Sequence, residues 1–401
     1  MHDSFPLITT LVASTLGAFI FGMIAKRLKL PSILGYLVAG VLIGPHTPGF
    51  IGSVEIASQF SDVGVILLMF GVGLHFSLKD LMSVRKIAIP GALIQVTAGT
   101  ALGFGCGTMV GFTLAESLCF GFTLSIASTI VALRGLDHRG LLKSEAGILA
   151  VGWLIVEDIV AVVIIVLLPV LAPLMMSHGE PVDLPAVGYH LLLSVVKISV
   201  FATLMIVVGR RLLPPLLVMI VKTKSREMSS LGIVAIALGF AYVAYALFDA
   251  SFALGAFLAG FVLNESAIGH KVADQALPLR DTFAVLFFVS VGMLFDPSIL
   301  IRDPILVLLA LGVIALGTLA VTFGLMRMFG VSLQVGLLVA VSLAQIGEFS
   351  FIFTGLARQL GLLSPHIYDV ILASALLSIA INPFLFRLIE AGKGAKSRVA
   401  R

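Results

Sequence analysis

Two adjacent acidic residues, Glu157 and Asp158, interrupt a long apolar stretch of the sequence. The stretch runs from Ala146 to Pro169 and can cross a bilayer as a helix, for which roughly 20 apolar residues suffice. A charged side chain at mid-membrane costs at least about 2.5 kcal/mol, so an acidic pair there indicates an ion or proton site facing a water-filled cavity. The alternative is a structural pair that a buried base such as Lys197 neutralises.

The chemistry that these two carboxyl groups could perform is the exchange of a proton for a cation. Two adjacent carboxyl groups in a low dielectric cannot both ionise cheaply, so the pair binds a proton readily. Carboxylate oxygens are also the ligands that hard cations prefer. Proton and cation then compete for one site, and a site that opens to each side of the membrane in turn performs cation/proton antiport.

The composition requires a membrane protein of many helices. The chain has 401 residues, of which 59% are hydrophobic and 11% charged, and its mean hydropathy is +1.16. Its apolar runs do not alternate at period two, which excludes the pattern of barrel strands. The net charge of +4 does not indicate a nucleic-acid partner, because the basic residues lie at the ends of the apolar runs.

The cysteines and the first apolar run point to no further chemistry. Cys106 and Cys119 lie in or beside apolar segments without metal-ligand spacing, so we interpret them as core thiols and not as a disulfide or a metal site. The run 5–25 has no basic residue before it and a basic cluster after it, which is typical of a retained first span rather than a cleaved signal peptide.

Thirteen apolar segments are predicted to span the membrane. They are 5–25, 31–46, 60–76, 87–111, 116–134, 146–173, 189–213, 228–247, 251–264, 279–296, 303–329, 333–359 and 366–390. With the first connection in the cytoplasm, the outer loops hold only two basic residues, Arg302 and Arg358, and the inner loops hold nearly all the others. This bias predicts an outer N-terminus and a cytoplasmic C-terminus.

The sequence also repeats itself at an offset of about 220 residues. The matched segments are 35–44 with 255–264, 62–76 with 281–295, and SIASTI at 125–130 with SLAQIG at 342–347. Matched units lie seven spans apart, so the copies enter the membrane from opposite sides, as in secondary transporters. We therefore divide the chain into a first repeat with linker helix (1–213), a second repeat (228–390) and a basic cytoplasmic tail (391–401).

The third matched pair places small polar residues in the middle of two spans. Such residues can unwind a helix, because their side chains satisfy the backbone groups that a break frees. Two half-helices that cross at mid-membrane would offer carbonyl groups to a cation and N-termini to an anion. The alternative is ordinary hydrogen bonding of Ser and Thr between unbroken helices. The symmetry of the two segments, together with Glu348 beside the second, favours two broken helices.

These considerations predict an ion and proton site made of six residues. Asp158 is the predicted cation ligand and proton carrier, and Glu157 is its charged neighbour that tunes proton affinity and net charge. Neutral oxygens would come from Ser128, Thr129 and Gln345. Glu348 is either a further ligand or a structural partner of the half-helix N-terminus. The ions are cargo, and we expect no resident cofactor and no enzymatic reaction.

Other polar residues have simpler interpretations. Asp62 and Asp281 lie at matched repeat positions near span ends, where helix capping is the preferred interpretation. Lys197 could pair with an acid or extend toward an interface. Trp153 precedes Glu157 by one helical turn and should pack beside the site. The three histidines near cytoplasmic loops, His75, His138 and His270, could sense pH, but solvation in the loops is the simpler interpretation.

Missing motifs narrow the function further. The chain has no GxxxxGK[ST] segment and so gives no sign of an ATP-driven pump, and it has no TVGYG-like potassium filter. Three rivals to the antiporter remain. They are a ligand-gated potassium efflux channel on the same scaffold, an organic-anion symporter with crossed broken helices, and a non-transporting sensor that binds ions.

Several motifs together resemble those of the Kef/YbaL-type branch of the cation:proton antiporters. They are GYLVAGVLIGP, VGVILLMFGVGLHFSLKDL, the STI-bearing fifth span, GWLIVEDIV, FALGAFLAGFVLNES, FAVLFFVSVGMLFDP and SLAQIGEFSFI, and they cover the chain from about Leu7 to Glu390. The resemblance implies thirteen helices, a dimerisation domain, and a core domain that moves like an elevator. It also implies a homodimer in a bacterial inner membrane.

This sequence departs from the pattern of that family at two positions. Glu157-Asp158 stands where members often have Gln-Asp or Asp-Asp, and Thr318 stands where many carry a lysine. Members usually continue into a cytoplasmic nucleotide-binding regulatory domain, whereas this sequence ends in a short basic tail. Either the protein lacks such a domain, or a regulatory domain or subunit lies outside this sequence, so control by nucleotide or glutathione is not carried over to these residues. We predict exchange of a monovalent cation for protons, with potassium favoured and sodium next.

Overall fold

The computed structural model describes residues 6–28, 30–49, 52–75, 78–137, 139–176, 189, 192–193, 196–197, 199–201, 203–223, 225–248, 252–264 and 269–399. Within these residues the chain is helical, and its one β-type pairing is an isolated antiparallel bridge between Ala127 and Ile346. Seven helices are long and apolar enough to cross a membrane, and four shorter apolar helices accompany them. The predicted all-α membrane fold is confirmed, whereas the count of thirteen spans stays a prediction.

The chain divides into two compact units, each built from segments of both halves of the sequence. Unit 1 comprises Met1–Gly22, Gly35–Ser77 and Ile165–Leu294. Its helices are α1 (Pro6–Arg27), α2 (Ser32–Ile43), α3 (Val54–His75), η1 (Met205–Gly209, a π-helix), α9 (Arg210–Lys222), α10 (Arg226–Phe248), α11 (Phe252–Asn264) and α12 (Gly269–Met293). The last residues of α1 and the first of α2 belong to the other unit.

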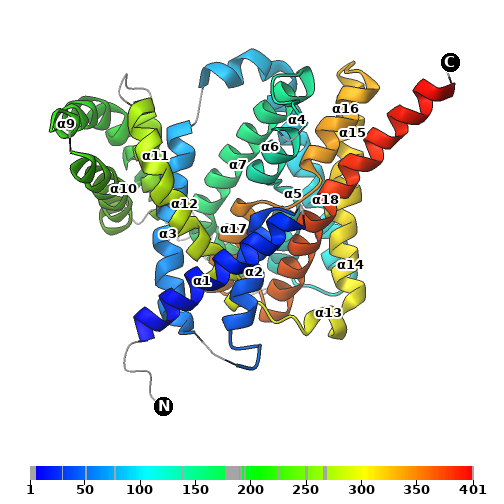
Figure 1. Cartoon of the computed structure of the whole chain (residues 1–401), viewed down its shortest axis with the longest axis horizontal. Helices are drawn as coiled ribbons and strands as arrows, with labels where there is room; N and C mark the ends of the chain where they lie inside the picture. The colour runs from blue at the N-terminus through cyan, green and yellow to red at the C-terminus, as the bar shows by residue number, and fades with distance from the viewer. Residues whose placement is uncertain are drawn as a thin grey trace. The chain divides into compact units, whose positions relative to one another are not determined.

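Unit 1 is organised around α3, which packs against both α11 and α12 (Figure 1). Its core includes alanines of the first three helices, Ala18, Ala39 and Ala57, packed with Val289 and Met293 of α12. Such small residues let helices approach closely in a membrane, where the packing of surfaces replaces the hydrophobic effect as the attraction between helices.

Unit 2 comprises Met23–Leu34, Leu78–Ile164 and Phe295–Arg401. Its helices are α4 (Leu78–Met109), α5 (Leu114–Ser125), α6 (Thr129–Asp137), α13 (Ile299–Arg302), α14 (Pro304–Gly312), η2 (Val313–Gly317, a π-helix), α15 (Thr318–Met328), α16 (Leu333–Leu343), α17 (Glu348–Gln359) and α18 (Pro365–Val399). The long helix α7 (Glu145–Met176) begins in unit 2 and continues into unit 1 from Ile165.

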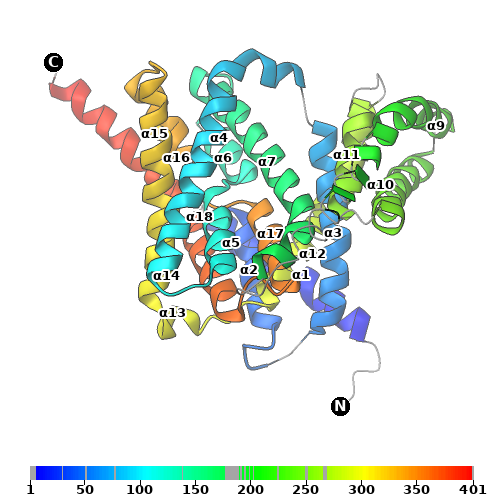
Figure 2. The ribbon, with the colours of Figure 1, turned by 180° about the vertical axis from the view of Figure 1, so that it is seen from behind.

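Inside unit 2, α4 lies beside α5 and α15, and α15 lies beside α16, as Figure 2 shows from behind. A capping box starts α5, where the Thr113 hydroxyl accepts from the Glu116 N–H and the Glu116 carboxyl accepts from the Thr113 N–H at 3.0 Å. The π-helix η2 joins α14 to α15, and π-helical turns within α-helices are frequently found at functional sites.

The predicted repeats fall on corresponding helices. The first matched pair lies on α2 and α11, the second on α3 and α12, and the third on the junctions α5–α6 and α16–α17. The seventh predicted span, 189–213, is described only in part, because residues 190–191, 194–195, 198 and 202 lie outside the described residues. The division into two repeats and a tail therefore stays a prediction, and it differs from the division into two contact units.

The capping interpretation of two aspartates is wrong. Asp62 lies more than two turns inside α3, which begins at Val54, and Asp281 lies more than three turns inside α12, which begins at Gly269. Neither can cap a helix start. Of the three histidines singled out, His138 lies outside the described residues, and for His75 and His270 only the backbone is described.

The close contact between α2 and α12 can be tested at Gly40. A Cβ atom there would lie 2.0 Å from the Val289 carbonyl oxygen, so Gly40→Ala must push the helices apart. We expect a lower thermal unfolding temperature in detergent, corresponding to about 1–3 kcal/mol of overpacking. Gly239→Ala is the control, because Gly239 lies inside α10 with open space around it, and alanine there favours the helix. Equal unfolding temperatures for both variants would contradict this packing.

Candidate ion site

Two helices of unit 2 are broken at the predicted positions, and the broken segments pair with each other. α5 ends at Ser125 and α6 begins at Thr129, while α16 ends at Leu343 and α17 begins at Glu348. The two non-helical segments run antiparallel: Ala127 bridges Ile346, and the Gly347 N–H donates to the Ile126 carbonyl at 3.2 Å. The prediction of two broken, crossing helices is confirmed.

The crossing is close because one of its residues has no side chain. A Cβ atom on Gly347 would lie 2.5 Å from the Ala127 carbonyl oxygen and 2.7 Å from the Ser128 Cα, far inside normal contact distances. The backbone of Gly347 is extended, with φ −107° and ψ 176°, so the requirement for glycine is one of space and not of backbone conformation.

Side chains satisfy many of the backbone groups that the breaks release. Gln345 bonds to both backbone groups of Ser128: its Oε1 accepts from the N–H at 3.3 Å and its Nε2 donates to the carbonyl at 2.9 Å. The Ser378 hydroxyl of α18 accepts from the Ile346 N–H, and Gln95 of α4 donates to the Ser125 carbonyl. A non-helical backbone is tolerated at membrane depth only when the protein supplies such partners.

Three consecutive residues at the first break, the last of which begins α6, donate hydrogen bonds to three different carboxyl groups. The Ala127 N–H donates to Glu157 Oε2 at 2.9 Å, and the Ser128 hydroxyl donates to Glu348 Oε2 at 3.1 Å. The Thr129 hydroxyl donates to Asp158 Oδ2 at 2.9 Å. The break therefore collects the carboxyl groups of α7 and α17 around one short segment. Of the six predicted site residues, five share this network directly, and Gln345 joins it through Ser128.

The carboxyl groups differ in how deeply they are buried and in whether both of their oxygens accept hydrogen bonds. Glu157 is 0% exposed and Glu348 is 4% exposed, whereas Asp158 and Thr129 are partly accessible. Glu157 Oε1 and Asp158 Oδ1 are buried and accept no hydrogen bond from any described residue. Both Glu348 and Glu157 lie close enough to Asp158 for their negative charges to repel its own. The cluster therefore favours a bound proton or cation.

The two carboxyl groups of α7 have no basic partner among the described ion pairs. No described Lys, Arg or His forms an ion pair with Glu157 or Asp158. Lys197 is partly buried, and its pairing with an acid stays a prediction. Thr318 is buried in the first turn of α15, directly after η2. Its equivalence to the lysine of relatives stays a prediction.

Sequence reasoning missed four supporting residues of the site. They are Ala127, whose contribution is a backbone N–H, and the polar side chains of Gln95, Ser350 and Ser378. The last three are polar residues inside apolar spans, and that signal could have identified them. Trp153 is fully buried, and a Cβ atom on Gly91 of α4 would lie 2.2 Å from its ring; that it packs beside the site stays a prediction.

Both cysteines are free thiols; Cys119 is buried in α5 and Cys106 is partly buried in α4. Among the described residues, no group of three His, Cys, Asp or Glu side chains is arranged to hold a resident metal ion. The oxygen atoms of the crossing are carboxylate, hydroxyl, amide and carbonyl oxygens, which suit a hard cation that binds and leaves.

Comparison with known proteins gives one family. The sodium/hydrogen exchanger transmembrane family matches residues 14–389. The chain is 51% identical over 390 residues to YbaL of Escherichia coli (strain K12), a protein assigned to the cation/proton antiporters, with 97% of this chain and 70% of YbaL covered. It is 31% identical to the glutathione-regulated potassium-efflux system protein KefC of Klebsiella pneumoniae, covering all of this chain and 63% of KefC.

A solved structure shares the fold. It is that of the sodium proton antiporter MjNhaP1 from Methanocaldococcus jannaschii at pH 8, with a TM-score of 0.72 at 17% identity. The match covers 97% of this chain and 98% of that one. At this level of identity the likeness concerns the fold alone.

Substituting Gly347 tests whether the close crossing of the two breaks is required. Gly347→Ala must displace the Ala127–Ser128 backbone, and this backbone positions the donors to all three carboxyl groups. We expect loss of cation-dependent proton movement in vesicles and a lower unfolding temperature. Gly355→Ala, in the same helix α17 with open space around it, is the matched control and should retain both properties. Full activity of Gly347→Ala would show that the close approach is dispensable.

Proposed function

Because the chain belongs to the sodium/hydrogen exchanger family of transmembrane proteins, we propose that it exchanges a monovalent cation for protons at the acidic cluster of unit 2. The observation that carries this proposal is the set of three hydrogen bonds from Ala127, Ser128 and Thr129 to three separate carboxyl groups. It gathers three carboxyl groups at the crossing of two broken helices, where a proton or a cation can balance their charge.

Asp158 is the proposed exchange group. It is partly accessible, one of its oxygens has no protein partner, and the other accepts from Thr129. A carboxyl group in this position can hold a proton or, when deprotonated, a cation that also contacts neutral oxygens of Ser128, Thr129 and Gln345. The two ions exclude each other from one site, and this exclusion couples their movements.

Glu157 has a different proposed role, which is to hold the first break. It is fully buried, and its Oε2 accepts from the Ala127 N–H, a backbone group that the break removes from helical bonding. This contact is made by a carboxylate oxygen, and an amide oxygen could make it as well. Glu157 therefore acts mainly as a positioning residue and tunes Asp158 through its charge.

Glu348 is the proposed fixed negative charge of the site. It begins α17, where the partial positive charge of a helix N-terminus favours a carboxylate, and it accepts a hydrogen bond from Ser128. A permanent charge at this position attracts a cation to the site and repels the charge of Asp158 until a proton or cation arrives. One carboxyl group can serve both as a cation ligand and as the partner of the helix N-terminus, so the two interpretations of Glu348 are compatible.

All six site residues belong to unit 2, which supports a mechanism in which the site travels with one unit. We propose that unit 2 moves as a body and opens the site to each side of the membrane alternately. Potassium is the favoured cargo, since KefC is named for potassium efflux, and sodium is the next candidate. We also propose a homodimer in a bacterial inner membrane, with an outer N-terminus and a cytoplasmic C-terminus.

The proposal is tested with purified protein in proteoliposomes that hold a pH gradient and a fluorescent pH reporter. Potassium, then sodium, should dissipate the gradient for the wild type but not for Asp158→Asn. Because proton and cation compete, the half-saturating cation concentration should fall by up to about tenfold for each unit by which pH rises within the competitive range. Glu145→Gln, an exposed carboxyl group on the same helix α7, is the control and should behave as the wild type.

Two other results of that measurement would replace the proposal. Cation flux without proton movement would favour a potassium channel on this scaffold. Binding of a cation without any flux would favour a sensor.

A pair of substitutions separates the two acidic residues of α7. Glu157→Gln keeps an oxygen that can accept from the Ala127 N–H, so we expect it to fold and to retain cation-dependent proton movement. Glu157→Ala leaves that buried N–H without a partner, at a cost of about 1–3 kcal/mol, and should lower both stability and exchange. Parallel measurements of unfolding temperature and vesicle exchange test this. If Glu157→Gln were as inactive as Asp158→Asn, Glu157 would be an exchange group and not a positioning residue.

A further inference from the structure

Three buried polar atoms of unit 2 have no hydrogen-bond partner among the described residues. They are Gln95 Oε1 of α4 and, on α7, Trp153 Nε1 and Glu157 Oε1. All three residues are 0% exposed. A buried polar group without a partner costs free energy, so nearly all such groups in proteins are bonded to another residue or to an ordered water molecule. Each of these three atoms therefore requires a partner.

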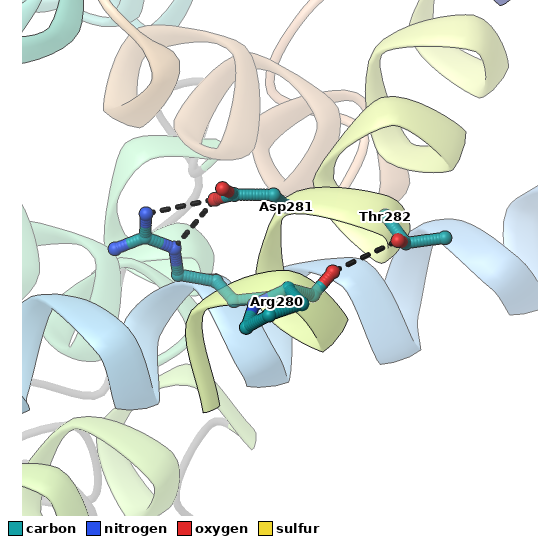
Figure 3. Close-up of polar contacts among 4 residues, drawn as sticks. Arg280, Asp281 and Thr282 are labelled. Atoms are coloured by element: carbon teal, nitrogen blue, oxygen red, sulfur yellow. Dashed lines mark hydrogen bonds and ion pairs between the residues drawn. The ribbon is translucent and has the colours of Figure 1, made fainter. Parts of the chain in front are cut away.

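An exposed carboxyl group of the same protein shows what Glu157 lacks. Asp281 of α12 has a side chain that is 66% exposed, and its Oδ1 accepts from Arg280 Nε at 3.0 Å and from a second guanidinium nitrogen at 2.8 Å (Figure 3). Solvent and a neighbouring base therefore satisfy that group. The Glu157 carboxyl is closed to solvent, and no base pairs with it among the described ion pairs.

The first break has two hydrogen-bonding edges, and Gln95 and Glu157 share one of them. Ile126 is extended, with φ −95° and ψ 118°, so the carbonyl before it and the N–H after it point to the same side. The first of these groups, the Ser125 carbonyl, accepts from Gln95 Nε2 at 3.0 Å. The second, the Ala127 N–H, donates to Glu157 Oε2 at 2.9 Å. The carbonyl of Ile126 itself bonds to the second break, on the other edge.

The Gln95 and Glu157 side chains therefore end side by side. The backbone groups that they bind are separated by a single extended residue, whose rise is about 3.3 Å. The Ser125 carbonyl can only accept, so the amide nitrogen of Gln95 must face it and the amide oxygen is left over. Glu157 likewise gives one oxygen to the break and has one left over. Two neighbouring acceptors cannot bond to each other, so both need a donor.

Trp153 offers a donor on the same pair of helix faces. It lies four residues before Glu157, so the two share one face of α7. The same spacing puts Gly91 and Gln95 on one face of α4. These faces meet at Gly91, where a Cβ atom would lie 2.2 Å from the Trp153 ring, and both reach the same edge of the first break four residues later. The Trp153 N–H can only donate, and it has no acceptor among the described residues.

We propose that these three atoms bind one buried water molecule at this edge of the first break, and that Gln95 and Trp153 are positioning residues that hold Glu157 through it. The water donates to Gln95 Oε1 and to Glu157 Oε1 and accepts from the Trp153 N–H. Buried waters typically make about three such bonds to groups that otherwise lack partners. A proton on Glu157 could serve both oxygens but would leave the indole N–H without an acceptor. The water site rests on the fold, whereas its effect on exchange rests on the proposed function.

Spectroscopy tests the water site without requiring transport, because Trp153 is the only tryptophan of the chain. Ultraviolet resonance Raman spectra report whether the indole N–H is hydrogen-bonded, and we expect a bonded N–H in the wild type. Gln95→Leu removes one of the three groups that hold the water, so it should shift the band toward a free N–H. Thr97→Ala, at an exposed position of the same helix α4, is the matched control and should leave the band unchanged. A free N–H in the wild type, or a bonded one that Gln95→Leu does not alter, would overturn the inference.

An experimental density map that resolves ordered water identifies the donor. We expect one peak at about 2.7–3.2 Å from Gln95 Oε1, Trp153 Nε1 and Glu157 Oε1. Direct contact between the two oxygens, with no peak beside them, would show a proton shared by Gln95 and Glu157 and would overturn the water site.

Exchange in proteoliposomes tests the positioning role. Trp153→Phe keeps an aromatic ring but removes the N–H, so we expect a maximal rate roughly 3- to 10-fold lower. The half-saturating cation concentration should change less than about twofold, because the proposed cation ligand is Asp158. Thr97→Ala should behave as the wild type, and an unchanged rate for Trp153→Phe would overturn the positioning role. A bonded N–H and a bridging peak in a protein without exchange would support the water site and remove the antiporter proposal.

Discussion

The structure of the site depends on one short non-helical segment of backbone inside a membrane span, where backbone groups are otherwise paired by a helix. Residues 126–128 leave their helix at membrane depth, and each polar group released there needs a partner inside the protein. The partners include the carboxyl group of Glu157 and the amide of Gln345, and the Ser128 hydroxyl of the same segment donates to Glu348. The same side chains therefore have two tasks. They stabilise the break, and their oxygen atoms attract a cation.

Much of this arrangement could be predicted because the residue types involved are rare in apolar helices. A carboxyl pair in a span, a hydroxyl-rich segment repeated after about 220 residues, and a glutamate beside its second copy each indicate a site on their own. The helices that carry the repeats could also be predicted, because the length of an apolar run and the spacing of its glycines can be read from one sequence. The two breaks lie where SIASTI and SLAQIG placed them.

Three features could not be predicted, because they arise from contacts between distant segments. The Ala127 N–H binds Glu157 only because α7 passes beside the first break, and an alanine gives no sequence signal of a backbone donor. The apolar runs begin at residues 60 and 279 and so place Asp62 and Asp281 near helix starts, whereas α3 starts at Val54 and α12 at Gly269. The two contact units also draw on both halves of the chain, which no local pattern reveals.

The pairing of Ala127 with Ile346 has a consequence for the biogenesis of the protein. The two residues come from opposite halves of the chain, so the first break lacks its partners Gln345 and Gly347 while only the first half has been synthesised. During insertion, residues 126–128 and their carboxyl groups must either stay hydrated or wait outside the hydrocarbon, since unsatisfied groups cost several kcal/mol there. A cation-binding centre therefore cannot assemble before the last third of the chain has left the ribosome.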